Sequence, residues 1–288
     1  MFKLLLLGCL ICLISAEKPY PTLSDPTRIP GTVSIGQNIC MGATEVTLKE
    51  WLDFIANNDF DPSLYPENSS LSDPWTKLIF EDLKNKGNFK HLKVTRTSIN
   101  HHQQISIWLK NDAFCDSLKK IEYPPLNSPV TGISFEQAIR FCKWKESLIN
   151  KDRHNSKKIQ IGLPSKEIYK RVIENIDSLC VNCSSPCRSF RFNYKHPSCQ
   201  DKESTNSFEG KSLLRVDSYW PTSLGMFGIQ GNAAEMTSSK GIAMGGSFKH
   251  YANQSLSTEV QSYSGPEDWL GFRYVVTLDA SPATDKGH

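Results

Sequence analysis

The chain has 288 residues, a formal net charge of +3, and 22% charged and 39% hydrophobic residues. This is the composition of an ordinary globular protein. It holds no run of lysine and arginine longer than two residues, so a weak positive charge without a basic cluster argues against nucleic acid as a partner.

The first sixteen residues differ from the rest. Lys3 precedes a short apolar run that ends in a small residue, Ala16, an order that is typical of a secretory signal peptide. We therefore predict that residues 1–16 are a signal peptide and that the chain is exported, to the periplasm, the cell surface or the medium. A lipid anchor on Cys9 is the alternative, because residues 6–9 resemble a bacterial lipobox. No later stretch is apolar enough to be a transmembrane segment.

We predict that the mature chain forms one large domain. Residues 17–28 are rich in proline and are expected to form an extended lead-in. The domain itself is predicted to span residues 29–276, with a polar and poorly periodic insertion at 57–94 and a cysteine-rich loop at 180–199. Residues 277–288 are predicted to be a flexible tail.

Capping boxes mark two helices. Thr47 and Glu50 form the first, because the threonine can accept from the third helical N–H while the glutamate reaches back. Ser134 and Gln137 form the second in the same way. The apolar spacing then predicts two buried stripes, made of Leu48, Trp51, Leu52 and Ile55 in the first helix and of Phe135, Ala138, Ile139, Phe141, Cys142 and Leu148 in the second.

Other elements are shorter. Residues 33–40 alternate imperfectly, as an edge strand would, and residues 105–109 are expected to be a strand. One short helix is predicted from Trp75 to Asn85. Another is predicted to begin after Ser165 and to run to about Asn175.

Seven cysteines follow the predicted signal peptide, and an exported chain meets an oxidising compartment. The candidates for disulfide bonds are Cys40, Cys115, Cys180, Cys183, Cys187 and Cys199. Because seven is odd, at least one thiol stays free or pairs outside the chain, and Cys142 is the best candidate since it falls in a helical apolar pattern. A structural zinc site in the cluster 180–199 is the alternative to disulfides there.

The stretch from Met226 to Val276 combines short apolar runs with seven glycines, which suits tight turns between short strands. It contains the blocks GNAAE, GGSF and GFR, and the chain also carries MGATEVT at 41–47 and PVTGISFEQA at 129–138. In this order the blocks resemble the formylglycine-generating enzyme (sulfatase-modifying factor) family. The resemblance implies an α+β fold, the loop-rich variant of the C-type lectin fold that this family has, with short strands and a few helices.

The resemblance also implies a site for copper. Enzymes of the family hold the ion with two cysteines, five residues apart, soon after the GGS block, and soft thiolates suit Cu(I). Here the aligned positions hold His250 and Ser255, and no cysteine follows Cys199. We therefore predict no copper and no formylglycine-generating activity.

We therefore expect an exported, non-catalytic member of the family that acts as a binding or structural scaffold. Its partner would be an unknown protein, peptide or glycan. Its binding groove is expected to be lined by Ser247, His250, Ser255, Tyr263 and Trp269. An enzyme of the same superfamily with a different metal, or with no copper, is the alternative. A lipid-anchored lipoprotein of a surface assembly is a further one.

A structural calcium ion is also implied by the resemblance, at the GNAAE loop. Carried over residue by residue, its ligands are Gly228, Gly231, Ala233 and Glu235. Calcium prefers several oxygen ligands, which the carbonyls of a glycine-rich turn can supply. The alternative is that Glu235 is a buried ion-pair partner of Arg273 or of another cation.

Overall fold

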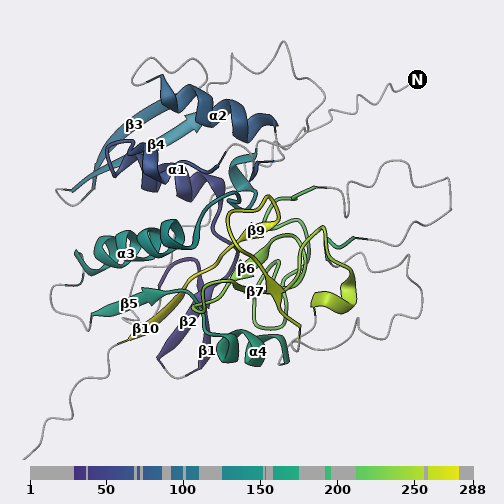
Figure 1. Ribbon diagram of the computed structural model, residues 1–288. Helices are drawn as coiled ribbons and strands as arrows, with labels where there is room; N and C mark the ends of the chain where they lie inside the picture. Colours follow the sequence, from purple (N-terminus) through teal and green to yellow (C-terminus); the bar gives the residue numbers. More distant parts are fainter. Residues whose placement is uncertain are drawn as a thin grey trace, which may run out of the picture.

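The structure is a computed structural model (Figure 1). It describes residues 29–36, 38–67, 70–71, 74–85, 92–99, 102–109, 125–151, 153, 158–174, 192–195, 212–255 and 259–278. The predicted signal peptide, the lead-in and the candidate cysteines Cys115, Cys180, Cys183, Cys187 and Cys199 lie outside these residues, and so does most of the cysteine-rich loop. Among the residues described, no helix is both long enough and apolar enough to span a bilayer.

One antiparallel sheet joins the two ends of the domain. Its strands, in spatial order, are β1 (Thr32–Gly36), β2 (Ile39–Gly42), β10 (Val275–Leu278) and β5 (Ile159–Gly162). The single edge strand expected over 33–40 is instead a hairpin. Asn38, with φ of 58°, reverses the chain, and asparagine tolerates this left-handed conformation better than most residues. Strand β10 ends at Leu278, two residues past the predicted end of the domain.

Both capping boxes are present. Helix α1 (Leu48–Ala56) begins at Thr47, whose Oγ1 accepts from the Glu50 N–H at 3.1 Å while the Thr47 N–H donates to Glu50 Oε2 at 3.1 Å. Helix α3 (Phe135–Lys151) begins with the matching pair of bonds between Ser134 and Gln137, at 2.8 and 3.2 Å. Helix α4 (Lys166–Glu174) begins where it was predicted, after a serine that accepts from the N–H of residue 168.

The predicted stripe of α1 is confirmed, since all four of its residues are buried. In α3, Ala138, Phe141 and Cys142 are buried, Phe135 and Ile139 are half-buried against the core, and Leu148 is 36% exposed. Ile149 packs against the core in its place, because a helix of 3.6 residues per turn carries position 148 off the buried face. Cys142 is buried in the same core as a free thiol, and burial raises its pKa to about 12.

Aromatic rings fill the space where α1, α3 and the C-terminal segment meet. Trp51 stacks on Phe141 at 5.7 Å between ring centroids and meets Phe54 edge-on at 5.1 Å. Phe272 meets both Trp51 and Phe141 edge-on, at 6.1 and 5.4 Å. Such offset and edge-to-face pairs add to the stabilisation that burial alone provides.

The predicted insertion at 57–94 contributes to this core. It contains a 3-10 turn (Pro62–Leu64), helix α2 (Pro74–Lys84) and the first residues of β3 (Leu92–Ile99), which pairs with β4 (His102–Leu109). The helix was predicted and so was the end of β4, whereas β3 was not. Side chains from the segment, including Leu64, Phe80 and Leu83, are fully buried in the main core.

The glycine-rich stretch forms short strands joined by turns, as predicted, and these strands make another four-stranded sheet. Its order is β8 (Gln261–Ser262), β7 (Ile242–Met244), β6 (Ala234–Met236) and β9 (Leu270–Gly271), with β6 and β9 parallel. The strands are two or three residues long, so the turns between them carry most of this region. These turns hold the candidate site.

Candidate functional site

The GGSF block forms a tight turn directly after β7. Gly246 has φ of 67°, and a Cβ at this position would collide with the Ser255 hydroxyl. Only glycine satisfies both demands. The turn therefore holds Ser255, the last residue of a short 3-10 helix (Ala252–Ser255), against the backbone of Gly246.

Ser247 and His250 are joined within this turn. The His250 N–H donates to the Ser247 carbonyl at 2.9 Å, and Ser247 Oγ lies 2.7 Å from His250 Nδ1. Ser247 Oγ also accepts from the Lys249 N–H at 3.2 Å. The hydroxyl can either donate to Nδ1 or accept from it, so the direction of this bond follows the tautomer of the ring.

One further contact fixes the histidine, and an ion pair lies next to it in the chain. Its ring meets Trp269 edge-on, with centroids 4.9 Å apart. Beside it, Lys249 Nζ is 2.6 and 2.7 Å from the two oxygens of Asp268. Burial, and to a lesser degree the charge of Lys249, lowers the His250 pKa below its ordinary value of 6.5. The imidazole is therefore neutral at neutral pH.

Of the five expected groove residues, Ser247, His250 and Trp269 come together. Ser247 and Ser255 are both fully buried, because the tight turn faces them inward, and the groove itself stays a prediction. Tyr263 lies elsewhere, with its N–H on the Gly241 carbonyl at 3.1 Å, and its hydroxyl is buried. The part of the site that a partner can reach is therefore the turn around His250.

The GNAAE loop is organised by a buried arginine. Arg273 Nε donates to Glu235 Oε2 and Nη2 donates to Glu235 Oε1, both at 2.7 Å, and both side chains are fully buried. The guanidinium also donates to the carbonyls of Gly42 at 3.0 Å and of Phe227 at 2.8 Å. The structure thus has the ion pair that was the alternative to calcium.

A second buried carboxylate, Glu45, lies in the same place. A Cβ on Gly228, which has φ of 56°, would come within 2.6 Å of a Glu45 oxygen. Glu45 Oε1 accepts from Asn232 Nδ2 at 3.0 Å, whereas Oε2 has no hydrogen bond and lies 4.0 Å from the nearest nitrogen of Arg273. Burial raises the pKa of Glu45 from 4.5 to about 8, so the group is mostly protonated at neutral pH.

These contacts favour the ion-pair alternative for Glu235, and the calcium site expected at Gly228, Gly231, Ala233 and Glu235 stays a prediction. Both oxygens of Glu235 are bound by the guanidinium, and its charge is already matched. Glu45, and not open space, lies against Gly228. Among the residues described, no three histidine, cysteine, aspartate or glutamate side chains gather as a metal site.

Sequence analysis did not find the role of Glu45, Asn232 or Tyr169. Glu45 stands in the MGATEVT block, and Asn232 in the GNAAE block, so each was quoted as part of a pattern without a function. Tyr169 donates from its hydroxyl to the Ile229 carbonyl at 3.1 Å and so supports the same loop from α4. A polar residue in the middle of an apolar block is the signal that could have indicated burial with a partner.

Comparison with known proteins agrees with the resemblance and with the predicted fold class. Residues 22–278 match the family model described as the sulfatase-modifying factor enzyme 1-like domain. Among solved structures, PvdO from Pseudomonas aeruginosa is similar with a TM-score of 0.41 and 12% identity, over 83% of this chain and 80% of that one. CarF is similar with a TM-score of 0.44 and 17% identity, over 84% of this chain and 87% of that one. No curated protein matches.

The protonation of Glu45 makes stability depend on pH. Its pKa is about 8 in the folded chain against an ordinary 4.5, so between these values only the folded state holds the proton. The free energy of unfolding is therefore expected to fall as pH rises through this range, by at most about 1.4 kcal/mol per pH unit from this group, and to level off above it. Urea unfolding of the wild type and Glu45→Gln at several pH values measures the difference.

The matched control is Glu81→Gln, which removes an exposed carboxyl. It should keep the pH dependence of the wild type, while Glu45→Gln flattens it. An unchanged slope in Glu45→Gln would contradict the assignment of a buried, protonated Glu45.

Calcium is expected to add little to stability, because Arg273 already neutralises Glu235. A site with a Kd a hundredfold below the calcium concentration would raise the free energy of unfolding by about 2.7 kcal/mol, and we expect less than about 0.5 kcal/mol. Unfolding in millimolar calcium chloride against the same buffer with chelator measures this. A large rise in the free energy of unfolding in calcium that Glu235→Gln abolishes would support the calcium site at this loop.

Proposed function

Because the chain belongs to the sulfatase-modifying factor enzyme 1-like family, we propose that it is an exported, non-catalytic member of that family. It acts as a binding or structural scaffold in the cell envelope or outside the cell. Family membership supplies the fold, while the function rests on the residues of the site.

One observation carries this proposal: the chain has no thiol where the chemistry of the family needs two. No cysteine follows Cys199 in the sequence, and the aligned positions hold His250 and Ser255. The Ser255 hydroxyl is buried against Gly246, and Nδ1 of His250 is engaged by Ser247. Since Cu(I) selects soft sulfur ligands, an imidazole and a buried hydroxyl cannot replace the thiolate pair.

A binding role is supported by what remains accessible. We call residues 247–251 with Asp268 and Trp269 the His250 turn. Tyr251 is 42% exposed there, with Lys195 Nζ 5.0 Å from its ring centroid. The Lys249–Asp268 ion pair lies on the same turn. An aromatic ring beside paired charges on a rigid turn suits a protein, peptide or glycan partner.

Two alternatives keep the same fold. The first is an enzyme with a different metal or with none. It is favoured by the distance of 2.7 Å between Ser247 Oγ and His250 Nδ1, which is that of a nucleophile and its base, but the hydroxyl is buried and a substrate would have to open the turn. The second is a lipid-anchored lipoprotein, with Cys9 as the anchor.

The test is copper binding coupled to peptide oxidation. Untagged protein is loaded with Cu(I) against a competing chelator and then given oxygen, a thiol reductant and a cysteine-containing sulfatase-type peptide. We expect no loss of sulfur from the peptide, read by mass spectrometry. The matched variant His250→Cys with Ser255→Cys is expected to bind about one more equivalent of Cu(I) than the wild type, because it restores both sulfur ligands.

Turnover of the peptide by the wild type would overturn the proposal. Copper or iron that is retained by the wild type, and lost in His250→Ala, would favour the enzyme with a different metal. Equal copper binding by the wild type and the double-cysteine variant would show that the missing pair is not the cause of inactivity.

A further inference from the structure

Strand β1 is the edge of the first sheet, and its free side can be worked out from the register. The Ala43 N–H donates to the Gly31 carbonyl at 2.8 Å, which makes these two a hydrogen-bonded pair. Such pairs alternate along an antiparallel ladder, so Val33 and Met41 form the next one. Thr32 and Ser34 lie on either side of Val33 and occupy the alternate, non-hydrogen-bonded positions. Their backbone groups therefore point away from β2.

This outward row is open where the structure describes its surroundings. The Thr32 N–H is used in a turn to the Ile29 carbonyl at 3.2 Å. The Thr32 carbonyl and both backbone groups of Ser34 remain, and an exposed row of this kind is a template for another strand. Five residues make β1, enough for a short added strand.

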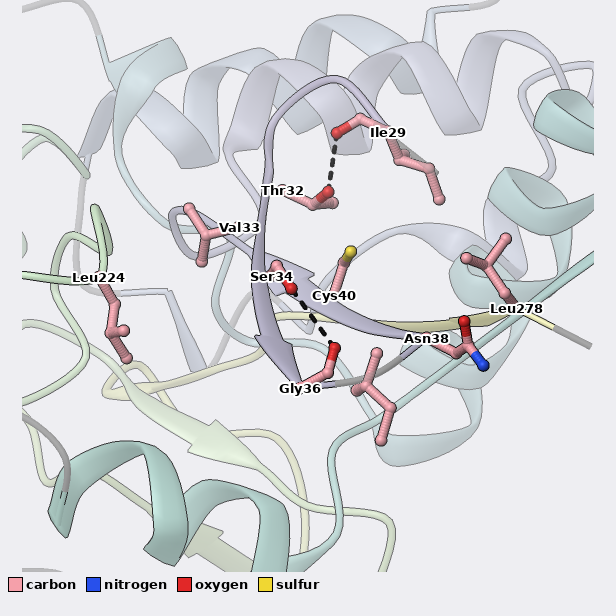
Figure 2. Close-up of a pocket in the computed structure, with 10 residues that line it drawn as sticks. Ile29, Thr32, Val33, Ser34, Gly36, Asn38, Cys40, Leu224 and Leu278 are labelled. Atoms are coloured by element: carbon pink, nitrogen blue, oxygen red, sulfur yellow. Dashed lines mark hydrogen bonds between the residues drawn. The ribbon is translucent and has the colours of Figure 1, made fainter. Parts of the chain in front are cut away.

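A cavity of about 480 Å³ lies beside this edge. In Figure 2, Val33 and Leu224 border it on one side of β1, and Cys40 and Leu278 border it on the other. None of the residues that line it carries a charge. Because Thr32, Ser34 and Asn38 line it together with apolar residues, the cavity suits a small uncharged side chain such as valine or threonine.

The sheet itself explains why this space exists. Helix α3 packs on β5, at the far end of the same sheet (Figure 1), where Ile159 and Ile161 are buried in the main core. Helix α4 packs beneath β1 on the opposite face, with Val172 and Ile173 against Val33. On the face where Ser34 lies opposite Cys40, Cys40 and Leu278 pack at the margin of the main core and stay partly exposed.

A positive charge stands at one end of the strand. The exposed Arg171 of α4 has its Nη2 3.8 Å from where a Cβ of Gly36 would be. It forms no ion pair with the residues described. A chain that runs along β1 would bring its own residue next to this guanidinium, and a carboxylate matches it.

We propose that β1 binds an extended segment of another protein by strand addition. Backbone hydrogen bonds form to Thr32 and Ser34, a small uncharged side chain enters the cavity, and an acidic residue pairs with Arg171. This mode gives affinity through the main chain and specificity through side-chain pockets. The site lies on a different sheet from the His250 turn and does not depend on it.

A second copy of this chain is a poorer occupant. Two β1 strands paired about a twofold axis would set the Gly36 end of one beside the Thr32 end of the other. The strand reads TVSIG and has no acidic residue, so each Arg171 would meet no carboxylate from the facing strand. The charge therefore favours a foreign acidic segment.

The test uses labelled peptides of about eight residues, a typical strand length, with alternating valine and threonine and two aspartates or two lysines at one end. Fluorescence polarisation of the full mature chain measures their Kd. We expect the acidic peptide to bind at least about tenfold more tightly than the basic one, a difference of about 1.4 kcal/mol. Arg171→Glu should reverse this preference, whereas Lys170→Glu, one residue away, should not.

Ser34→Pro tests the backbone pairing. Its N–H faces away from β2, so proline is tolerated there but removes the outward donor. We expect at least about tenfold weaker binding of the acidic peptide, with circular dichroism and thermal unfolding to check the fold. If the variant does not fold, the same peptide methylated on alternate backbone nitrogens should lose binding to the wild type.

Three results would overturn the proposal. One is no saturable binding of the acidic peptide. Another is binding that neither Ser34→Pro nor backbone methylation weakens. The third is a dimer of the wild type in solution that Ser34→Pro dissociates, which would make a second copy the occupant.

Discussion

The structure depends on one buried cation. Arg273 lies in the interior with no exposed surface and places its donors on Glu235 and on carbonyls from two other segments, including Gly42 and Phe227. Burying a guanidinium costs several kcal/mol unless its charge is paired and its hydrogens are bonded. Here both conditions are met only when the end of β2, the GNAAE loop and the GFR block are all in place. These blocks lie far apart in the sequence, and the arginine is where they meet.

The same arrangement sets the chemistry around it. One guanidinium serves two buried acids, and Glu235 has the closer, bidentate contact, so Glu45 is left with an unpartnered oxygen and a raised pKa. No side chain fits at position 228, because Glu45 lies against Gly228. From this fixed loop the chain passes through β6 and β7 to the turn that seals Ser255 inside and leaves His250 at the surface. The part of the fold that holds the domain together is intact, while no cysteine follows Cys199 in the chain.

Much of the fold could be predicted from the sequence, because many of its features are decided by residues that are close together in the chain. The capping boxes at Thr47 and Ser134 are decided within four residues, and glycine turns between short strands follow from composition. Strand β3, the reversal at Asn38 and the burial of Ser247 could not be predicted, because each is decided by partners distant in the sequence. Leu148 shows the same limit within a helix: its periodicity fitted a stripe, but the neighbours decided that Ile149 would fill the space. The pairing of Glu235 with Arg273 was predicted as an alternative to calcium, whereas the position of Glu45 beside this pair was not.

The most direct test is a double-mutant cycle on the buried ion pair. The free energy of unfolding is measured in urea for the wild type, Glu235→Gln, Arg273→Met and the double variant. If the guanidinium organises the loop through Glu235, the single changes should each cost about 3–5 kcal/mol, and the two should be coupled by about 2 kcal/mol or more. Additive costs, with a coupling near zero, would contradict the account.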